Sequence, residues 1–82
     1  MMSMRKRANS NEGDEFVECL GCYVKAESAK ALLVVQFDAG DGVWVPKSQI
    51  DPESEVQEKF DTGTLRVRRW IADDKGLEID AG

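Results

Sequence analysis

Apolar residues in this chain gather in short runs that favour strands. The clearest run, residues 31–37 (ALLVVQF), is dense in Val and Leu and too short for an independent helix. Side chains alternate between the two faces of a strand, and Gln36 interrupts the register that contains Leu32 and Val34. The predicted core face of this strand is therefore the other one, made of Ala31, Leu33, Val35 and Phe37.

The neighbouring segments extend this β-rich pattern. Residues 16–25 are rich in strand-forming side chains, and Gly21 inside them marks a bulge or a bend. Two glycines within 38–42 predict the loop of a β-hairpin that spans 31–45. Because proline lacks an N–H, we expect Pro46 at a sheet edge, a bulge or a bend.

The segment that follows the hairpin is compatible with two structures. Asp51 suits the cap of a helix or the start of a turn, and the four-residue spacing of Val56 and Phe60 fits a short helix over 52–59. A strand over 55–59 fits the same residues, so both alternatives stay open at this point.

The last third of the chain predicts one strand and one helix. The sequence Leu-Arg-Val-Arg alternates cleanly, which predicts a strand with Leu65 and Val67 inward. The pattern then becomes helical, and we expect a helix of about two turns over 69–75. Gly76 is the expected left-handed residue at the end of this helix, with Leu77 folding back onto it.

Together these elements predict a mainly β protein. The expected fold is a small antiparallel barrel or a strongly bent sheet of about four to five strands, SH3-like or OB-like, with a short C-terminal helix. A chain of 82 residues is long enough for one small domain. We assign residues 15–78 to that domain, residues 1–14 to a disordered tail and residues 79–82 to a frayed end.

The charge is acidic and unevenly distributed. The chain has 11 basic and 16 acidic residues, a net charge of −5, and three of the basic residues (Arg5, Lys6, Arg7) lie in the tail. Residues 8–82 therefore carry the remaining 8 basic and all 16 acidic residues, a net charge of −8. Such a body repels phosphate at long range, so nucleic acid is a disfavoured partner, whereas the acidity suits a basic protein surface or simple solubility.

The sequence lacks the residues of common catalytic sites. Histidine is absent, which excludes Ser-His-Asp and Cys-His nucleophile arrangements and imidazole metal ligands. Cys19 and Cys22 are at most half of a zinc site, and we expect them as buried strand cysteines. The five carboxylates between Asp51 and Asp61 lack the spacing of a calcium loop and are interpreted as a solvated acidic face, or as one that meets a basic partner. We expect no enzymatic activity, no metal and no cofactor.

Two kinds of side chain are candidates for a binding surface. Arg66, Arg68 and Arg69, with Lys47 close by, form the dense basic cluster of the folded part. They either pair with nearby carboxylates or contact the phosphates of a single-stranded nucleic acid. Both tryptophans are expected in the core, but Trp44 points away from its valine neighbours beside a sheet edge and is the better candidate for exposure and partner contact.

The runs VWVPKSQI (43–50) and WIADDKGL (70–77), with the strand ALLVV before them, resemble small uncharacterised proteins and domains of bacteriophage and bacterial genomes. This resemblance implies a small β domain in a phage or mobile-element setting and no particular chemistry. The N-terminus lacks the apolar segment of a secretory signal and the chain lacks a membrane-spanning run, so we expect a cytoplasmic protein with no membrane partner.

These observations predict a non-enzymatic, phage-type protein-binding module. It would dock a protein partner through an edge strand or a Trp-centred patch, and a candidate target is a nucleic-acid enzyme whose basic groove the acidic body would block or assist. The alternative is a small single-stranded nucleic-acid-binding barrel that uses Lys47, Arg66, Arg68 and Arg69. A third hypothesis is a self-associating module whose edge strands pair between chains.

Overall fold

The computed structural model describes residues 14–80. The expected disordered tail over residues 1–14 therefore lies, apart from Asp14, outside the described residues. Among residues 14–80, no helix has the length and apolar character that crossing a bilayer requires. In chain order the elements are β1 (Phe16–Glu27), β2 (Ala31–Gln36), β3 (Ala39–Pro46), the short 3₁₀ helix η1 (Lys47–Gln49), β4 (Thr62–Arg68) and the helix α2 (Arg69–Lys75).

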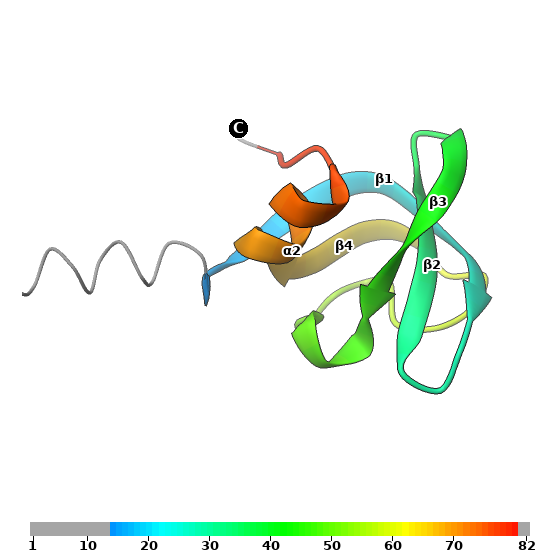
Figure 1. The fold of residues 1–82 in the computed structure, drawn as a ribbon, viewed down its shortest axis with the longest axis horizontal. Coiled ribbons are helices and arrows are strands. Elements are labelled where there is room, and N and C mark those ends of the chain that lie inside the picture. The colour runs from blue at the N-terminus through cyan, green and yellow to red at the C-terminus, as the bar shows by residue number, and fades with distance from the viewer. Residues whose placement is uncertain (1–13, 81–82) are drawn as a thin grey trace, which may run out of the picture.

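The four strands form one antiparallel sheet in the order β3-β2-β1-β4. This confirms a mainly β fold with a short C-terminal helix, and the sheet is not closed into a barrel because β3 and β4 remain its two edges. Figure 1 shows β1 and β4 running across the direction of the β2–β3 hairpin, so the sheet is strongly bent.

The bend of the sheet is associated with a bulge in β1. This strand pairs with β4 from Phe16 to Tyr23 and with β2 from Cys22 to Glu27, and its pairing with β4 shifts between Cys19 and Cys22. Gly21 lies in this shift with φ +67°, a conformation that glycine adopts without strain. The bulge predicted at Gly21 is therefore confirmed.

The predicted β-hairpin is present, but its turn differs from the expected one. Gln36 pairs with Ala39, so the turn comprises only Phe37 and Asp38, and both have the positive φ (55° and 56°) that a type I′ turn requires. The prediction of a loop over residues 38–42 is thus wrong. The two glycines assigned to it lie inside β3, where the pairing with β2 shifts.

The turn at Phe37 depends on the bulge in β1. The Phe37 N–H donates to the Gly21 carbonyl oxygen at 2.8 Å. A Cβ at position 21 would come within 2.5 Å of the Phe37 ring. The aromatic ring therefore occupies the space that the missing side chain leaves, which holds a bulky residue in an uncommon conformation.

The core face of β2 is the one opposite to the prediction. Leu32 and Val34 are buried in the main core, whereas Phe37 is 56% exposed. Ala31 and Leu33, also predicted for the core, are half-buried. Val35 is buried but lies outside the main core.

Gln36 explains why the opposite face of β2 is the buried one. Its side chain is buried on the same face as Leu32 and Val34. The Nε2 group donates to the carbonyl oxygens of Leu20 and Glu78 at 2.9 Å each, and Oε1 accepts the Glu78 N–H at 2.8 Å. Because these bonds satisfy the amide, a polar side chain is compatible with the core face.

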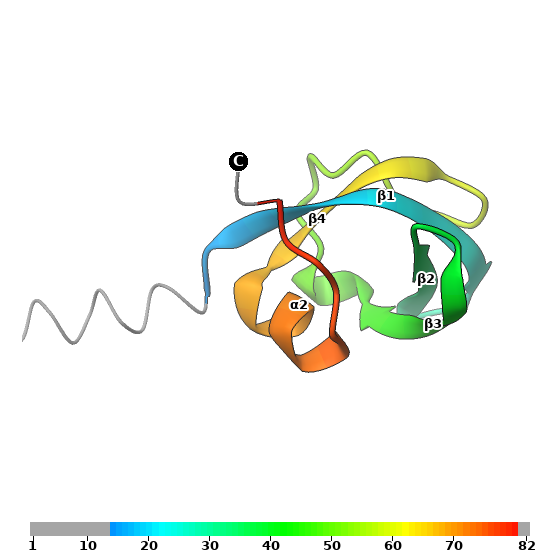
Figure 2. The same cartoon turned by 90° about the horizontal axis from the view of Figure 1, so that it is seen from above.

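The main core lies between the bent sheet and α2. Figure 2 shows β1 and β4 on one side of the molecule and α2 with β3 on the other. Every strand, the loop before β4 and α2 contribute to the core. Its members are Val17, Cys19, Cys22, Val24, Leu32, Val34, Val45, Ile50, Val56, Leu65, Val67, Ile71 and Ala72.

β4 and α2 agree with the sequence prediction. Leu65 and Val67 are fully buried, and the two arginines of β4 face outward. The helix has the predicted bounds, and Gly76 ends it with φ +74°. The Leu77 N–H donates to the Ala72 carbonyl oxygen at 2.9 Å, which is the predicted fold-back of the chain.

The segment between η1 and β4 forms neither the helix nor the strand considered for it. Residues 51–61 are a loop of successive turns. Asp51 begins the first turn, because its Oδ1 accepts the Glu53 N–H at 2.9 Å. Val56, with no exposed surface, anchors the loop in the core. Short polar side chains in this loop thus make the hydrogen bonds with the backbone that a helix or a strand would otherwise supply.

We expected residues 79–82 to fray. The structure attaches the described part of this end to the body, since the Asp80 N–H donates to the Glu18 carbonyl oxygen at 2.7 Å and Ile79 packs against the core. Residues 81–82 lie outside the described residues.

Candidate functional site

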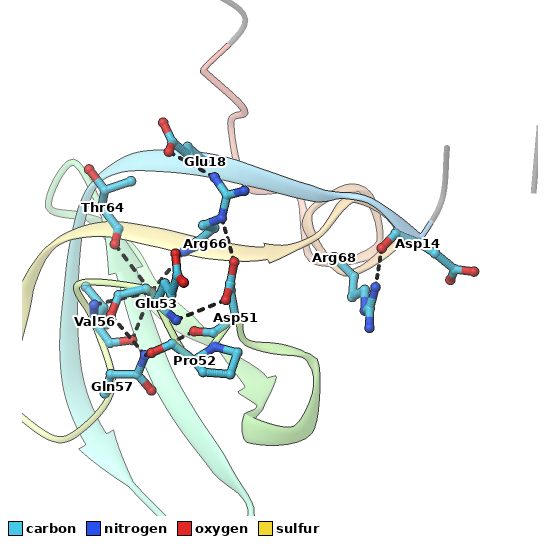
Figure 3. A network of polar contacts seen from close by, with 11 residues as sticks. Asp14, Glu18, Asp51, Pro52, Glu53, Val56, Gln57, Thr64, Arg66 and Arg68 are labelled. Carbon is cyan, nitrogen blue, oxygen red and sulfur yellow. Dashed lines mark hydrogen bonds and ion pairs between the residues drawn. The ribbon is translucent and has the colours of Figure 1, made fainter. Parts of the chain in front are cut away.

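Arg66, at the centre of the predicted basic strip, lies in a network of carboxylates (Figure 3). Its Nε donates to Asp51 Oδ2 at 2.6 Å and its Nη1 to Glu18 Oε2 at 3.1 Å. The Glu53 N–H and the Arg66 guanidinium together hold the pKa of Asp51 below its usual value, and the same carboxylate raises the pKa of Arg66. The guanidinium therefore ties β4 to β1 and to the loop 51–61.

Arg68 and Arg69 tie the end of β4 and the start of α2 to the residues that begin β1. Arg68 Nη1 donates to the Asp14 carbonyl oxygen, and its guanidinium lies 4.4 Å from the centre of the Phe16 ring. Arg69 pairs with Glu15 Oε2, at 2.9 Å from Nε and 2.8 Å from Nη2. Both arginines thus have partners from a distant part of the chain.

Lys47, the fourth basic residue of the predicted strip, pairs with Glu27. Its Nζ lies 2.5 Å from Glu27 Oε2. The hydrogen bond from Lys47, followed by that from the Lys59 N–H, lowers the pKa of Glu27. Lys47, Arg66 and Arg69 thus pair with carboxylates, whereas Arg68 bonds to a backbone carbonyl and lies over an aromatic ring.

The structure also separates the arginines of β4 from Trp44. Trp44 lies in β3, at one edge of the sheet, and Arg66 and Arg68 lie in β4 at the other edge, with β2 and β1 between them. The candidate residues therefore do not form one continuous strip along the sheet.

Trp44, the better of the two candidates for exposure, is 46% exposed, so the expected core position is wrong for it. It lies opposite Leu33 on β2, on the outer face of the sheet. Trp70, expected in the core, is equally exposed. That prediction is wrong because Ile71 and Ala72 occupy the core-facing side of the short helix.

The outer edge of β3 has no backbone partner within residues 14–80. The Lys47 N–H donates to the Lys30 carbonyl oxygen at 2.8 Å, so these two residues form a hydrogen-bonded pair. Hydrogen-bonded and non-hydrogen-bonded pairs alternate along antiparallel strands, and the register therefore makes Leu33 and Trp44 a non-hydrogen-bonded pair. The N–H and C=O groups of Trp44 therefore point away from β2. Pro46 occupies the same kind of position, so its missing N–H removes no hydrogen bond from the sheet.

The opposite edge, β4, is covered by the loop 51–61. The Asp51 N–H donates to the Arg66 carbonyl oxygen at 2.8 Å, and the Glu55 N–H donates to the Thr64 carbonyl oxygen at 3.2 Å. The Ser54 hydroxyl accepts the Arg66 N–H at 3.0 Å. Unpaired edges accept strands from other chains, so β3 and not β4 is available for such pairing.

A groove of about 350 Å³ lies beside the open edge. The hairpin turn and the first half of β3 form one wall, and the end of α2 with the residues after it forms the other. Its apolar lining includes Val43 and Leu77, and its charged lining includes Asp41, Lys75 and Glu78. The sequence analysis missed this groove because it joins two segments far apart in the chain, and the glycines of 38–42 were its one local signal.

Cys19 and Cys22 are buried strand residues, as predicted. Burial raises the pKa of Cys19 to about 12 and that of Cys22 to about 11. Both thiols are therefore protonated and weakly nucleophilic at neutral pH. Within residues 14–80, no group of three or more His, Cys, Asp or Glu side chains is placed to hold a metal ion.

No protein-family model, curated protein or solved structure matches this chain. Its function must therefore be argued from the geometry of its own residues.

Proposed function

We propose that this protein is a non-enzymatic protein-binding module whose partner docks on β3, along the open edge and beside Trp44. The observation that carries this proposal is the difference between the two edges of the sheet. A loop covers β4 with backbone and side-chain hydrogen bonds, whereas β3 keeps backbone groups that no other part of residues 14–80 binds, next to a half-exposed tryptophan. Tryptophan is enriched among residues that dominate binding energy at protein interfaces.

The nucleic-acid alternative has less support. Lys47, Arg66, Arg68 and Arg69 each have a partner within the protein, and a phosphate would have to displace it. The net charge of −5 also opposes phosphate binding at long range.

The acidic surface suggests the kind of partner. A phage-type setting, taken from the resemblance, and a cytoplasmic location agree with a protein that meets the basic groove of a nucleic-acid enzyme. The bent sheet, with η1 after β3 and a bridge between Ile50 and Val67, fits a small barrel-like plan of the SH3-like or OB-like kind. An open sheet edge such as that of β3 can accept an extended segment of a protein partner by strand addition.

Site-specific crosslinking tests the proposal. A photoreactive phenylalanine derivative replaces Trp44 in one sample and Glu58, an exposed residue of the loop 51–61, in the matched control. In a bacterial lysate we expect a discrete protein adduct at position 44, absent at position 58 and competed away by excess wild-type protein. Equal adducts at both positions, or none at position 44, would refute docking on β3.

An oligonucleotide titration tests the alternative function. We expect no quenching of tryptophan fluorescence by single-stranded DNA or RNA at low or moderate salt. Quenching that weakens steeply with salt would identify phosphate contacts and favour the nucleic-acid function instead.

A further inference from the structure

We infer that the partner segment is an extended peptide that adds to the sheet as a new strand beside β3, with apolar side chains in the groove and basic side chains next to its acidic surroundings. This inference rests on the proposed function and names the chemistry of its partner.

Backbone pairing is the first element of the inference. The N–H and C=O groups of Trp44 point away from β2, and the open stretch ends at Pro46, which has no donor. Free groups of this kind bind an extended chain through main-chain hydrogen bonds, and pockets beside them select alternate side chains.

The groove supplies those pockets on one face of the added strand. Side chains of an extended peptide alternate between two faces. One set would enter the space between β3 and the end of α2, where Val43 and Leu77 offer apolar contacts. The other set would lie on the outer face of the sheet, next to Trp44, which is 46% exposed.

The negative charge around the groove favours a basic peptide. The hairpin turn, the first half of β3 and the stretch from Asp73 to Glu78 carry five exposed carboxylates and one lysine, Lys75. The carboxylates are Asp38, Asp41, Asp73, Asp74 and Glu78. The local net charge of −4 attracts a cationic partner and repels an acidic one.

The test uses the full chain and a synthetic probe, an N-acetylated and C-amidated peptide that repeats Lys-Val four times. Titration into ¹⁵N-labelled protein should shift the backbone amides of Gly40, Gly42 and Trp44, and fluorescence anisotropy should give a saturable curve. The fully N-methylated peptide, which keeps the side chains but has no backbone donors, should bind at least tenfold more weakly. The charge-inverted peptide that repeats Glu-Val should not bind.

Charge reversal at the groove supplies the matched variants. Combining Asp41→Lys with Glu78→Lys should weaken binding of the Lys-Val peptide about fivefold or more, because two favourable exposed charge interactions become repulsive. Combining Glu53→Lys with Glu58→Lys makes the same change of charge in the loop 51–61, away from the groove, and should change affinity less than twofold. Unchanged dispersion of amide signals verifies that each variant is folded.

The outcomes separate the inference from the proposed function. Absence of amide shifts at millimolar peptide, or equal binding of the Glu-Val peptide, overturns the inference. The same amides shifting on dilution without peptide, with a dimer seen by sedimentation, would make a second copy the occupant and also overturn it. If the crosslink at position 44 is found but the peptide does not bind, docking on β3 stands and strand addition fails. If neither is found, both are refuted.

Discussion

Replacing Gln36 with alanine should release the C-terminal segment and destabilise the whole domain. The buried amide makes three hydrogen bonds, one to the Leu20 carbonyl oxygen and two to the backbone of Glu78, all at 2.8–2.9 Å. It thereby joins β2, the bulge of β1 and the segment that follows α2. A shorter apolar side chain satisfies none of these groups.

The expected size of the effect follows from the bonds that are lost. A neutral intramolecular hydrogen bond contributes about 0.5–1.5 kcal/mol net to stability. Three such bonds give about 2–4 kcal/mol for Gln36→Ala, because water can reach the exposed residues Leu20 and Glu78 after the change and limits the penalty of unpaired groups. In a domain of this size, such a loss lowers the melting temperature by about 10–25 °C.

Urea unfolding and amide hydrogen exchange together measure this prediction. The free energy of unfolding should fall as stated, and the Glu78 amide should exchange faster in the folded state. Gln49→Ala is the matched control, because within residues 14–80 the Gln49 side chain bonds only to the neighbouring Ser48 hydroxyl, at 3.2 Å, and the change should alter stability by less than about 0.5 kcal/mol. Equal losses in the two variants would show that the buried amide contributes no net stability and would refute the reasoning.

Three other measurements test separate parts of the structure. The folded-state pKa of Asp51 is lowered, so its contribution to stability is complete above its ordinary pKa of 3.8 and is lost as pH falls through the lower folded value. The free energies of unfolding that urea gives for Asp51→Asn and wild type should therefore converge as pH falls below about 4. Gly21→Ala should destabilise the protein by about 1–3 kcal/mol in the same assay, since a Cβ with φ +67° would meet the Phe37 ring. Cys19 and Cys22, with pKa values of about 12 and about 11, should react with a thiol reagent at pH 8 only after unfolding.

Each of these measurements has a control within the chain. Gly40 also has positive φ, but a Cβ there meets nothing within 4 Å, so Gly40→Ala should be milder than Gly21→Ala. A constant stability difference between Asp51→Asn and wild type from pH 7 down to pH 2 would contradict the role given to that carboxylate. Rapid modification of the native protein would contradict the burial of the thiols.

Local chemistry along the chain was sufficient to predict several elements. The alternation of Leu65 and Val67 identified the inward face of β4, and Gly76 identified the end of α2. Gly21 identified the bulge in β1. Each of these features depends on residues within a few positions of one another, so backbone preference and side-chain periodicity determine it.

Tertiary contacts decided the features that the sequence by itself left open or suggested wrongly. The inward face of β2 depends on Gln36, whose amide is satisfied by groups from Leu20 and Glu78. From the sequence alone, the arginines fitted either partners within the protein or phosphate contacts. The structure shows that their partners are Asp51 and groups from residues 14–18. Only the folded chain shows that a loop covers β4, while the outer edge of β3 stays unpaired within the described residues 14–80. A buried polar group, an ion pair and a free sheet edge are each determined by what lies opposite them, and here those groups come from distant parts of the chain.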